Sequence, residues 1–469
     1  MRILDLDGLR STLRNAPDAA RLQPIGLSQV HIGLDVLAQL PTIVQSLRRP
    51  GEVLLMMDAT PMWRADADLK ALVEAQLSEC LPVRVAVLGS PGDLLHADEA
   101  TLAAAHEVAA GAGCVVTVGS GTITDIGKDA SAAAGNVPLV VVQTAVSVNG
   151  YSDDMAVLLK DGVKRTTPSR WPDALVVDTA VLESAPPAMN RAGAGELLSM
   201  FTAPADWYLA DALGMTDGYS PSVVAMYRDE GDALLGVAPL VGRGDPAGLQ
   251  ELARIMTLSG LALGVAGQTA PLSGMEHTVS HMLDMAAGAR RRPTALHGAQ
   301  VGVAAVLASL LWARVRRRID PERLRADAAF PDPGTLRARV VAAFDHLDPS
   351  GAMAAECWRD YERKLQRWHA QRERVTACAS DWAAHERALD ALVAPPEALV
   401  EVLRHARAPA RFSELDPPQD PQVARWALAN CHLMRDRFSI ADLAFLLGLW
   451  DDDDVTEVLD EARALGAGL

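Results

Sequence analysis

Three histidines and one glutamate have the side-chain types and the spacing that could hold a metal ion. His277 and His281 are four residues apart, so on a helix they share one face, and His297 follows after a proline-marked turn. Imidazole is the commonest metal ligand, and a divalent ion usually takes a third protein group such as a carboxylate. Glu196 is the best candidate because it lies in the glycine-flanked apolar run 192–198, where an unpartnered carboxylate is costly to bury. On spacing alone, a pair of surface or core histidines remains the plainer alternative.

A glycine turn between a strand and a helix suggests a second kind of site. The apolar run 114–118 leads directly into Gly119-Ser120-Gly121-Thr122, and helical spacing follows. Glycines allow close approach of the backbone, and the N–H groups at a helix N-terminus attract a phosphate. The motif is neither GxGxxG nor a Walker loop, so a simple connecting turn is an equal alternative. Asp58, which ends the apolar run 53–58, lies where an acid can hold a ribose hydroxyl, or it caps its own turn.

The elements that would position these residues alternate in the manner of an α/β domain. Apolar runs predict strands at 24–33, 53–58, 83–88, 114–118 and 137–142. Helical spacing predicts helices at 66–79, 98–110 and 126–134, and a helix of small residues at 298–311.

Composition excludes several classes of protein. The chain has 469 residues, 49% hydrophobic and 22% charged, which is typical of a globular protein with a large core. Its net charge of -17 argues against nucleic acid or an anionic membrane as a partner. Five scattered cysteines without a CxxC predict buried thiols in a reducing compartment. The N-terminus lacks the apolar core of a signal peptide, and no apolar run approaches the roughly 20 residues of a membrane helix. We therefore expect a cytoplasmic protein.

Motifs along most of the chain together resemble a known family. They are Gly119 to Thr122 with Asp125 and Lys128, 144–151, 162–166, Asp178 with Leu182, 192–198 with 205–207, 273–277 with His281, 297–302 and 435–439. In this order they resemble the sn-glycerol-1-phosphate dehydrogenases, within the larger group of metal-dependent polyol dehydrogenases, iron-containing alcohol dehydrogenases and dehydroquinate synthases. The resemblance covers about residues 24 to 450.

The resemblance implies a dehydroquinate synthase-like fold in two domains. An α/β dinucleotide-binding domain is expected over residues 1–185, and an all-helical metal- and substrate-binding domain over residues 186–469, with the active site in the cleft between them. The surplus length lies at about 360–395, where alternating charges suggest a solvated helical hairpin. This hairpin is expected to be a passive insertion, with a lid or a subunit contact as the alternatives.

The resemblance also implies roles for individual residues. Glu196, His277 and His297 would bind a divalent metal, with zinc first and nickel or iron as alternatives. His281 would face the substrate and supply the proton, with Asn149 beside it and Lys164 as a phosphate partner; a solvated loop lysine is an equal reading of Lys164. NAD or NADP would be held by Asp58, Gly119, Ser120, Gly121, Thr122, Asp125, Thr144, Ser147 and Asp153.

The expected reaction is reduction of a small phosphorylated ketone, such as dihydroxyacetone phosphate, to a polyol phosphate, carried out by a homo-oligomer. Three departures from the family pattern bear on it: Glu196 and Asn149 replace aspartates, and Asp153 adds a carboxylate that would repel a phosphate. The alternatives are a sugar-phosphate cyclase or lyase of the dehydroquinate synthase type, and a non-catalytic descendant that binds a ligand.

Overall fold

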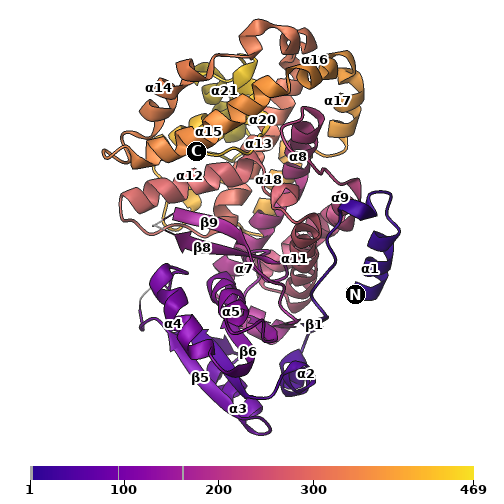
Figure 1. Ribbon diagram of the computed structural model, residues 1–469, viewed down its shortest axis with the longest axis vertical. Coiled ribbons are helices and arrows are strands. Elements are labelled where there is room, and N and C mark those ends of the chain that lie inside the picture. Colours follow the sequence, from indigo (N-terminus) through magenta and orange to yellow (C-terminus); the bar gives the residue numbers. More distant parts are fainter. Residues whose placement is uncertain (1–3, 93–94, 161–162) are drawn as a thin grey trace. The chain divides into compact units, whose positions relative to one another are not determined.

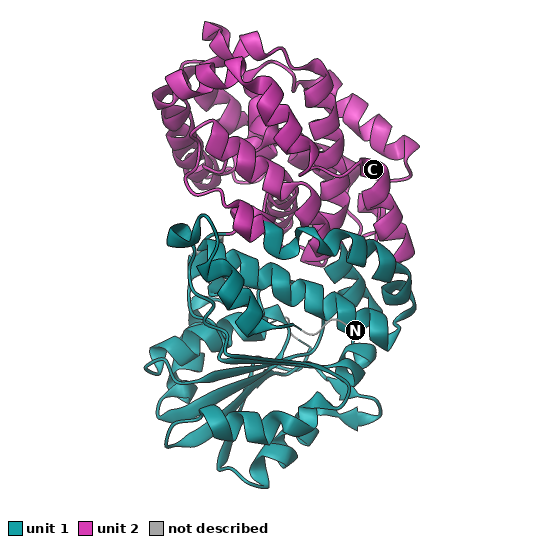
Figure 2. Ribbon diagram, turned by 90° about the vertical axis from the view of Figure 1, so that its right-hand side faces the viewer, with its two compact units in different colours: residues 1–194, 225–268 teal, residues 195–224, 269–469 magenta. Residues whose placement is uncertain are grey.

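The computed structural model describes residues 4–92, 95–160 and 163–469, which form two compact units (Figure 2). The first unit contains residues 1–194 and 225–268, and the second contains residues 195–224 and 269–469. Helices α7 (Pro187–Glu196) and α9 (Pro221–Arg228) each contain residues of both units. The contacts group residues 225–268 with the N-terminal residues, so the compact units do not divide the chain at one point. The domain boundary at residue 185 stays a prediction.

The first unit is built on a six-stranded parallel sheet, ordered β1-β10-β7-β6-β2-β5. Figure 1 labels three of its strands, β1, β5 and β6. Its strands are β1 (Gln29–Gly33), β2 (Glu52–Asp58), β5 (Val83–Leu88), β6 (Ala112–Gly119), β7 (Leu139–Gln143) and β10 (Ala174–Asp178). Strand β6 is buried along its whole length, as expected for a parallel strand covered on both faces. Such burial is why the runs 53–58 and 114–118 are almost continuously apolar, whereas the edge strand β5 has exposed Val85 and Val87.

Helices cover both faces of this sheet. On one face, α2 (Leu40–Leu47) and α3 (Leu69–Ser78) contribute to a core with alternate residues of β2, β6, β7 and β10. On the other face lie α4 (Glu99–Ala109) and α5 (Gly121–Ala133), whose Gly127 lies directly over Thr117 of β6. Crossover helices on both faces define a doubly wound α/β fold, which confirms the predicted fold class.

The remaining elements of the first unit extend this layer. They are α1 (Leu6–Arg14), α6 (Thr179–Ser184), α10 (Glu230–Arg243), α11 (Pro246–Ala266), the strand pair β3 (Trp63–Arg64) with β4 (Ala67–Asp68), and the hairpin β8 (Met155–Lys160) with β9 (Val163–Pro168). Helix α11 contacts both α6 and β1, so it packs with the sheet although it lies far along the chain.

The described part of the second unit is helical throughout, as the sequence predicts. Its α-helices include α8 (Ala203–Ala212), α12 (Met275–Ala289), α13 (His297–Arg318), α14 (Pro333–Phe344), α15 (Ala352–Ala370), α16 (Arg372–Ser380), α17 (Trp382–Asp390), α18 (Pro396–His405), α19 (Pro421–Asn430), α20 (Ile440–Leu446) and α21 (Asp452–Ala464). Helix α13 is the centre of this unit, since it contacts α12, α18, α20 and α21.

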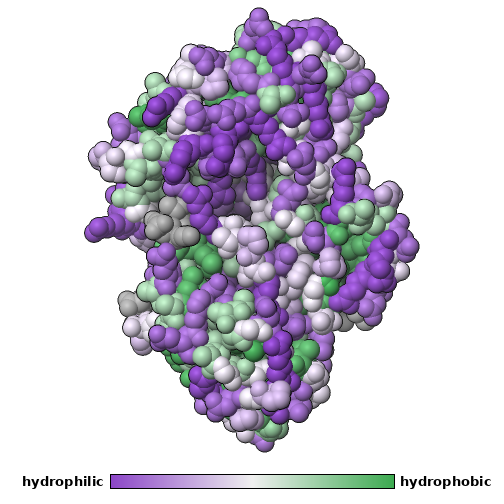
Figure 3. All heavy atoms as spheres, viewed as in Figure 1, coloured by the Kyte–Doolittle hydropathy of each residue, from purple (hydrophilic) through white to green (hydrophobic). Residues whose placement is uncertain are grey.

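The expectation that no apolar run reaches membrane-spanning length was wrong for α13. Among the described residues it is the one helix long and apolar enough to cross a membrane, with a mean hydropathy of 1.5 over its most apolar window. However, 94% of that window is buried inside the protein, so the apolar length reflects the core of a helical unit. Strongly hydrophilic residues cover much of the face shown in Figure 3, with apolar residues in smaller groups.

The segment predicted as a solvated hairpin is helical, and its charged side chains are exposed or partly exposed except for Lys364, which is buried. Most of the residues from 360 to 390 lie in α15, α16 and α17, and the side chains of Tyr361, Lys364 and Trp368 are buried. Lys364 donates to Asp442 over 2.6 Å, so its charge is neutralised inside the protein. The alternating charges suggested solvation because the partner of Lys364 lies 78 residues away in sequence.

The cysteines are all free; four are buried as predicted, whereas Cys80 is exposed.

Candidate functional site

Two helices of the second unit bring the three histidines together. Helix α12 begins at Met275 and carries His277 and His281 one turn apart, while α13 begins at His297 itself. The ring centroids of His277 and His297 are 5.2 Å apart, and those of His281 and His297 are 5.5 Å apart. The convergence expected from a helix, a turn and a second helix is therefore present.

Glu196 reaches this cluster because two backbones touch beside it. It is the last residue of α7, and a Cβ on the preceding Gly195 would lie only 2.3 Å from the carbonyl oxygen of Gly298 on α13. A Cβ on Gly302, one turn further along α13, would lie 2.8 Å from the Cα of Gly195. Glycine is needed on both sides, because any side chain would separate α7 from α13.

The ligand atoms of Glu196, His277 and His297 all lie within 4.8 Å of one another. Nε2 of His277 is 3.5 Å from Oε1 of Glu196, and Nε2 of His297 is 3.9 Å from Oε2. Oε2 is buried and has no hydrogen-bond partner among the described residues. A buried carboxylate oxygen without a donor, facing two imidazoles, is the arrangement that a divalent cation completes, so these residues fit a metal.

The charges in the cluster are strongly coupled. Burial opposes the charged form of His277, but hydrogen bonds with Glu196 and Glu276 outweigh it and raise the pKa of His277 to about 9. Burial would raise the pKa of Glu196, yet the neighbouring His297 and His277 lower it below its usual value. Without a metal, His277 therefore holds a proton that a metal ion must displace.

The affinity of this site for a metal ion should depend steeply on pH. Because His277 is protonated below about pH 9, one proton must leave for each ion bound, and apparent affinity should rise by up to about tenfold per pH unit below that value and then level off. Titration of the metal-free protein with Zn²⁺ or Ni²⁺ at several pH values measures this slope. An affinity that does not change between neutral pH and pH 9 would contradict the proton displacement.

The predicted dinucleotide residues cluster at the carboxyl edge of the sheet in the first unit. Gly119 ends β6, Ser120 follows it, and Gly121 with Thr122 begins α5, so the glycine turn does lead into a helix N-terminus. Ser120 does not cap α5 with its side chain, so this hydroxyl leaves the first N–H groups of the helix to other acceptors. The residue after β7, Thr144, donates its N–H to the carbonyl of Gly119, and Ser147 is buried nearby in sequence.

Asp58 lies at the end of β2, which neighbours β6 in the sheet. Its carboxylate accepts from the N–H of Thr60 over 3.0 Å and from the hydroxyl of Thr60 over 3.1 Å, which is the turn-capping role weighed as its alternative. Nζ of Lys70 is 3.7 Å from Oδ1 of Asp58 and also donates to its carbonyl oxygen. The acid is therefore accompanied by a positive charge that the sequence patterns did not identify.

Asp125 and Asp153 share a buried lysine. Nζ of Lys128 donates to Oδ1 of Asp153 over 2.6 Å and to the carbonyl oxygens of Gly150 and Met155. Burial raises the pKa of Asp125 to about 7, against the attraction of Lys128, and its carboxylate accepts from the N–H of Val157. The charge of Asp153 is thus neutralised within the first unit, which weakens the expectation that it would repel a phosphate.

The other predicted residues are placed less closely. Asn149 is partly buried in the loop after β7, and its carbonyl oxygen lies where a Cβ on Gly260 of α11 would approach to 2.4 Å. The backbone of Lys164 pairs with Leu159 in the β8–β9 hairpin, but its side chain lies outside the described part of the structure. The roles of Asn149 and Lys164 stay predictions.

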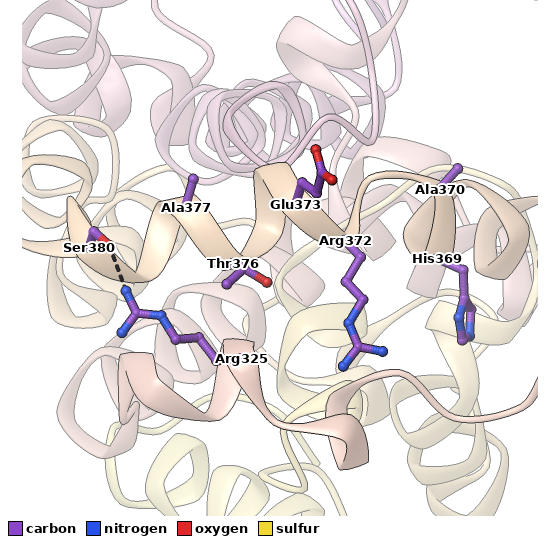
Figure 4. Close-up of a pocket in the computed structure, with 8 residues that line it drawn as sticks. All are labelled: Arg325, His369, Ala370, Arg372, Glu373, Thr376, Ala377 and Ser380. Carbon is purple, nitrogen blue, oxygen red and sulfur yellow. Dashed lines mark hydrogen bonds between the residues drawn. The ribbon is translucent and has the colours of Figure 1, made fainter.

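A separate cavity of about 690 Å³ lies on the second unit, lined by Arg325, His369, Ala370, Arg372, Glu373, Thr376, Ala377 and Ser380 (Figure 4). It contains none of the predicted site residues. Arg325 donates to Ser380 over 2.5 Å and pairs with Glu322, while Arg372 pairs with Asp327. Its two guanidinium groups already have acidic partners.

Comparison with known proteins identifies the family. The family model of the iron-containing alcohol dehydrogenases matches residues 31–186. The glycerol-1-phosphate dehydrogenase [NAD(P)+] of Bacillus licheniformis is 32% identical over 417 residues, covering 89% of this chain and 88% of that protein. The same enzyme of Bacillus velezensis is 34% identical over 202 residues, which is 43% of this chain and 49% of that protein.

The fold, the cluster of imidazoles and carboxylate, and these matches define a dehydrogenase of the iron-containing alcohol dehydrogenase class. The chain belongs to the glycerol-1-phosphate dehydrogenase family, whose members depend on NAD(P) and a metal, and the family and enzyme class predicted from its motifs are confirmed. A solved structure, a probable glycerol dehydrogenase from Sinorhizobium meliloti, has the same fold, with a TM-score of 0.58 at 15% identity over 93% of this chain and 98% of that one.

Proposed function

We propose that this chain reduces a small phosphorylated ketone, with dihydroxyacetone phosphate as the first candidate, to a polyol phosphate. Its cofactors would be NADH or NADPH and a divalent metal, with zinc tested first and nickel and iron as alternatives. The observation that carries the proposal is the convergence of Glu196, His277 and His297 within 4.8 Å, in a chain related to named glycerol-1-phosphate dehydrogenases.

The roles of the individual residues follow from their chemistry. Glu196, His277 and His297 would hold the metal, which when bound polarises a carbonyl oxygen and stabilises the negative charge that develops on it. The residues at the carboxyl edge of the sheet would hold the reduced nicotinamide cofactor, which supplies the hydride. His281 lies beside both histidine ligands, with ring centroids 6.5 Å and 5.5 Å away, so it can hold the proton that the product oxygen needs.

The surroundings of Asp58 support the use of either cofactor. A carboxylate at this position accepts a hydrogen bond from the ribose 2′-hydroxyl of NAD, whereas a 2′-phosphate needs a positive charge nearby. Lys70 supplies that charge 3.7 Å from the carboxylate. We therefore infer that the chain accepts both NADH and NADPH, and both belong in the assay.

The test is a screen of phosphorylated ketones and polyols with both cofactors and with several metals added back. We expect the near-ultraviolet absorbance of the reduced cofactor to fall in proportion to the product formed, since a dehydrogenase consumes one cofactor per turnover. Product formed without net oxidation of the cofactor would instead indicate a cyclase or lyase. A chain that binds neither metal nor nucleotide would remove the proposal altogether.

A further inference from the structure

Glu276, Ser280 and Gln300 lie next to the candidate metal ligands, and the choice of ligands does not explain their buried hydrogen bonds. We propose that Glu276, together with the pair Ser280–Gln300, positions the two imidazoles so that the Nε2 atoms of His277 and His297 both face Glu196. This inference rests on the proposed metal site and concerns residues that do not themselves touch the metal. Each partner decides which ring nitrogen carries the hydrogen and which is free to bind a cation.

On α12, Glu276 determines the state of His277. Oε1 of Glu276 lies 2.9 Å from Nδ1 of His277 and also accepts from the N–H of Gly274 over 2.6 Å. Its other oxygen accepts from the hydroxyl of Thr202 over 2.9 Å. An ionised carboxylate only accepts hydrogen bonds, so Nδ1 must carry the hydrogen. When His277 gives up its second hydrogen, as a metal ligand must, the lone pair is therefore on Nε2, which faces Glu196 at 3.5 Å.

His297 is held in the same state by a different set of groups. Oγ of Ser280 lies 3.0 Å from Nδ1 of His297 and donates its own hydrogen to Oε1 of Gln300 over 2.7 Å. A hydroxyl has one hydrogen, so Ser280 must accept from Nδ1–H of His297. In the neutral ring that binds a cation, Nε2 is then the nitrogen with the lone pair, and it faces Glu196.

The orientation of Gln300 follows from its other contacts. Its amide nitrogen donates to Oδ1 of Asp284 over 3.3 Å and to the carbonyl oxygen of Ala295 over 3.4 Å. Both of these groups accept hydrogen bonds, so the carbonyl end of the amide must point at Ser280. Gln300 is fully buried. Rotating its amide by 180° would exchange the nitrogen and the oxygen and leave buried polar groups without hydrogen bonds.

The turn that carries Glu276 is itself held from behind. Asp206 of α8 accepts from the N–H of Met275 over 2.8 Å and from the N–H of Ile440 over 2.9 Å. Arg437 donates to the carbonyl oxygen and the hydroxyl of Ser273. These contacts come from three separate segments of the chain, so the position of Glu276 is fixed by tertiary structure.

The experiment measures affinity for Zn²⁺ and Ni²⁺ in the full chain, by competition with a chelator, alongside the thermal midpoint of the metal-free protein. Glu276→Gln keeps the shape of the side chain but removes its charge, Ser280→Ala removes the acceptor for His297, and Gln300→Met removes the acceptor for Ser280. Each is expected to weaken metal binding by roughly 10- to 100-fold, the usual cost of losing such a partner. Ser309→Ala is the matched control, because Ser309 is also a buried serine; it lies on α13 and donates to the carbonyl oxygen of Ala394, away from the cluster.

The double variant Ser280→Ala/Gln300→Met separates positioning from general damage. Because Ser280 and Gln300 act on His297 as one unit, the double variant should bind metal about as weakly as the weaker single variant, whereas two independent structural defects would add. Ser309→Ala should retain wild-type affinity.

Two results would overturn this assignment. One is wild-type metal affinity in Glu276→Gln and Ser280→Ala, and the other is a loss of affinity that follows the loss of thermal stability equally in all variants, Ser309→Ala included. Both leave the proposed function intact. A wild-type chain that binds no divalent metal would instead overturn the proposed function, and this assignment with it.

Discussion

The His277→Ala variant is expected to lose specific binding of a divalent metal and to lose turnover by about 1,000-fold or more. His277 supplies one of the three ligand atoms that lie within 4.8 Å, and the remaining pair would leave a small ion weakly held. Polarisation of the substrate by a metal contributes several kcal/mol to the transition state, and each 1.36 kcal/mol corresponds to tenfold in rate. Elemental analysis of the purified variant and its rate with the preferred ketone measure both effects.

Two further variants make this result specific. His281→Ala should retain the metal and lose only rate, because His281 is proposed to hold a proton and not to bind the ion. His277→Gln preserves a polar group beside Glu276, so it tests whether loss of the buried charge disturbs the fold. Metal content unchanged in His277→Ala would remove the assignment of the ligand.

The Gly195→Ala variant should show the second large effect, a loss of both stability and metal affinity. The added Cβ would lie 2.3 Å from the carbonyl oxygen of Gly298 and 3.4 Å from the Cα of Gly302, which are backbone atoms that cannot move alone. Overpacking of this kind costs about 1–3 kcal/mol, and separating α7 from α13 moves the adjacent Glu196 away from His297. Thermal unfolding and metal titration of the same samples measure the two effects.

Gly288→Ala on α12 is the matched control for this prediction. Nothing lies within 4 Å of the position where its Cβ would be, and the residue is exposed in the last turn of the helix. Alanine there should stabilise the helix by up to about 1 kcal/mol. If Gly195→Ala unfolded at the wild-type temperature and bound metal with wild-type affinity, close contact between the two backbones would not be what places Glu196.

Local patterns predicted much of the fold because they report on burial within single elements. The apolar run ending at Asp58 is a strand buried on both faces, and the small residues after His297 form the central helix of the second unit. The expectation of solvation was wrong for one residue whose burial depends on a distant partner. The charges near Lys364 suggested solvation, but Asp442 neutralises that lysine inside the core. The apolar length of α13 was underestimated because its polar residues are interspersed.

The candidate ligands could be found from sequence because their chemistry is concentrated in short motifs. His277 and His281 are related by one helical turn, and the acid in the glycine-flanked run ending near Leu198 had few alternatives as a third ligand. The groups that orient them could not be found in this way. Glu276 and Gln300 lie within the same motifs, but a sequence does not show that one faces Nδ1 of His277 and the other reaches His297 through Ser280.

The sequence by itself therefore determined five of the six strands of the sheet, the family to which the chain belongs and the residues with the chemistry to bind a metal. These depend on spacing along one helix or strand, and such spacing is visible in one dimension. Strand β10 and the β8–β9 hairpin were not predicted. Only the tertiary structure decided how α7 meets α13 at Gly195, which nitrogen of each imidazole faces Glu196, and which charges are neutralised in the core. Each of these depends on distances between atoms that are far apart in the chain, and no local pattern encodes them.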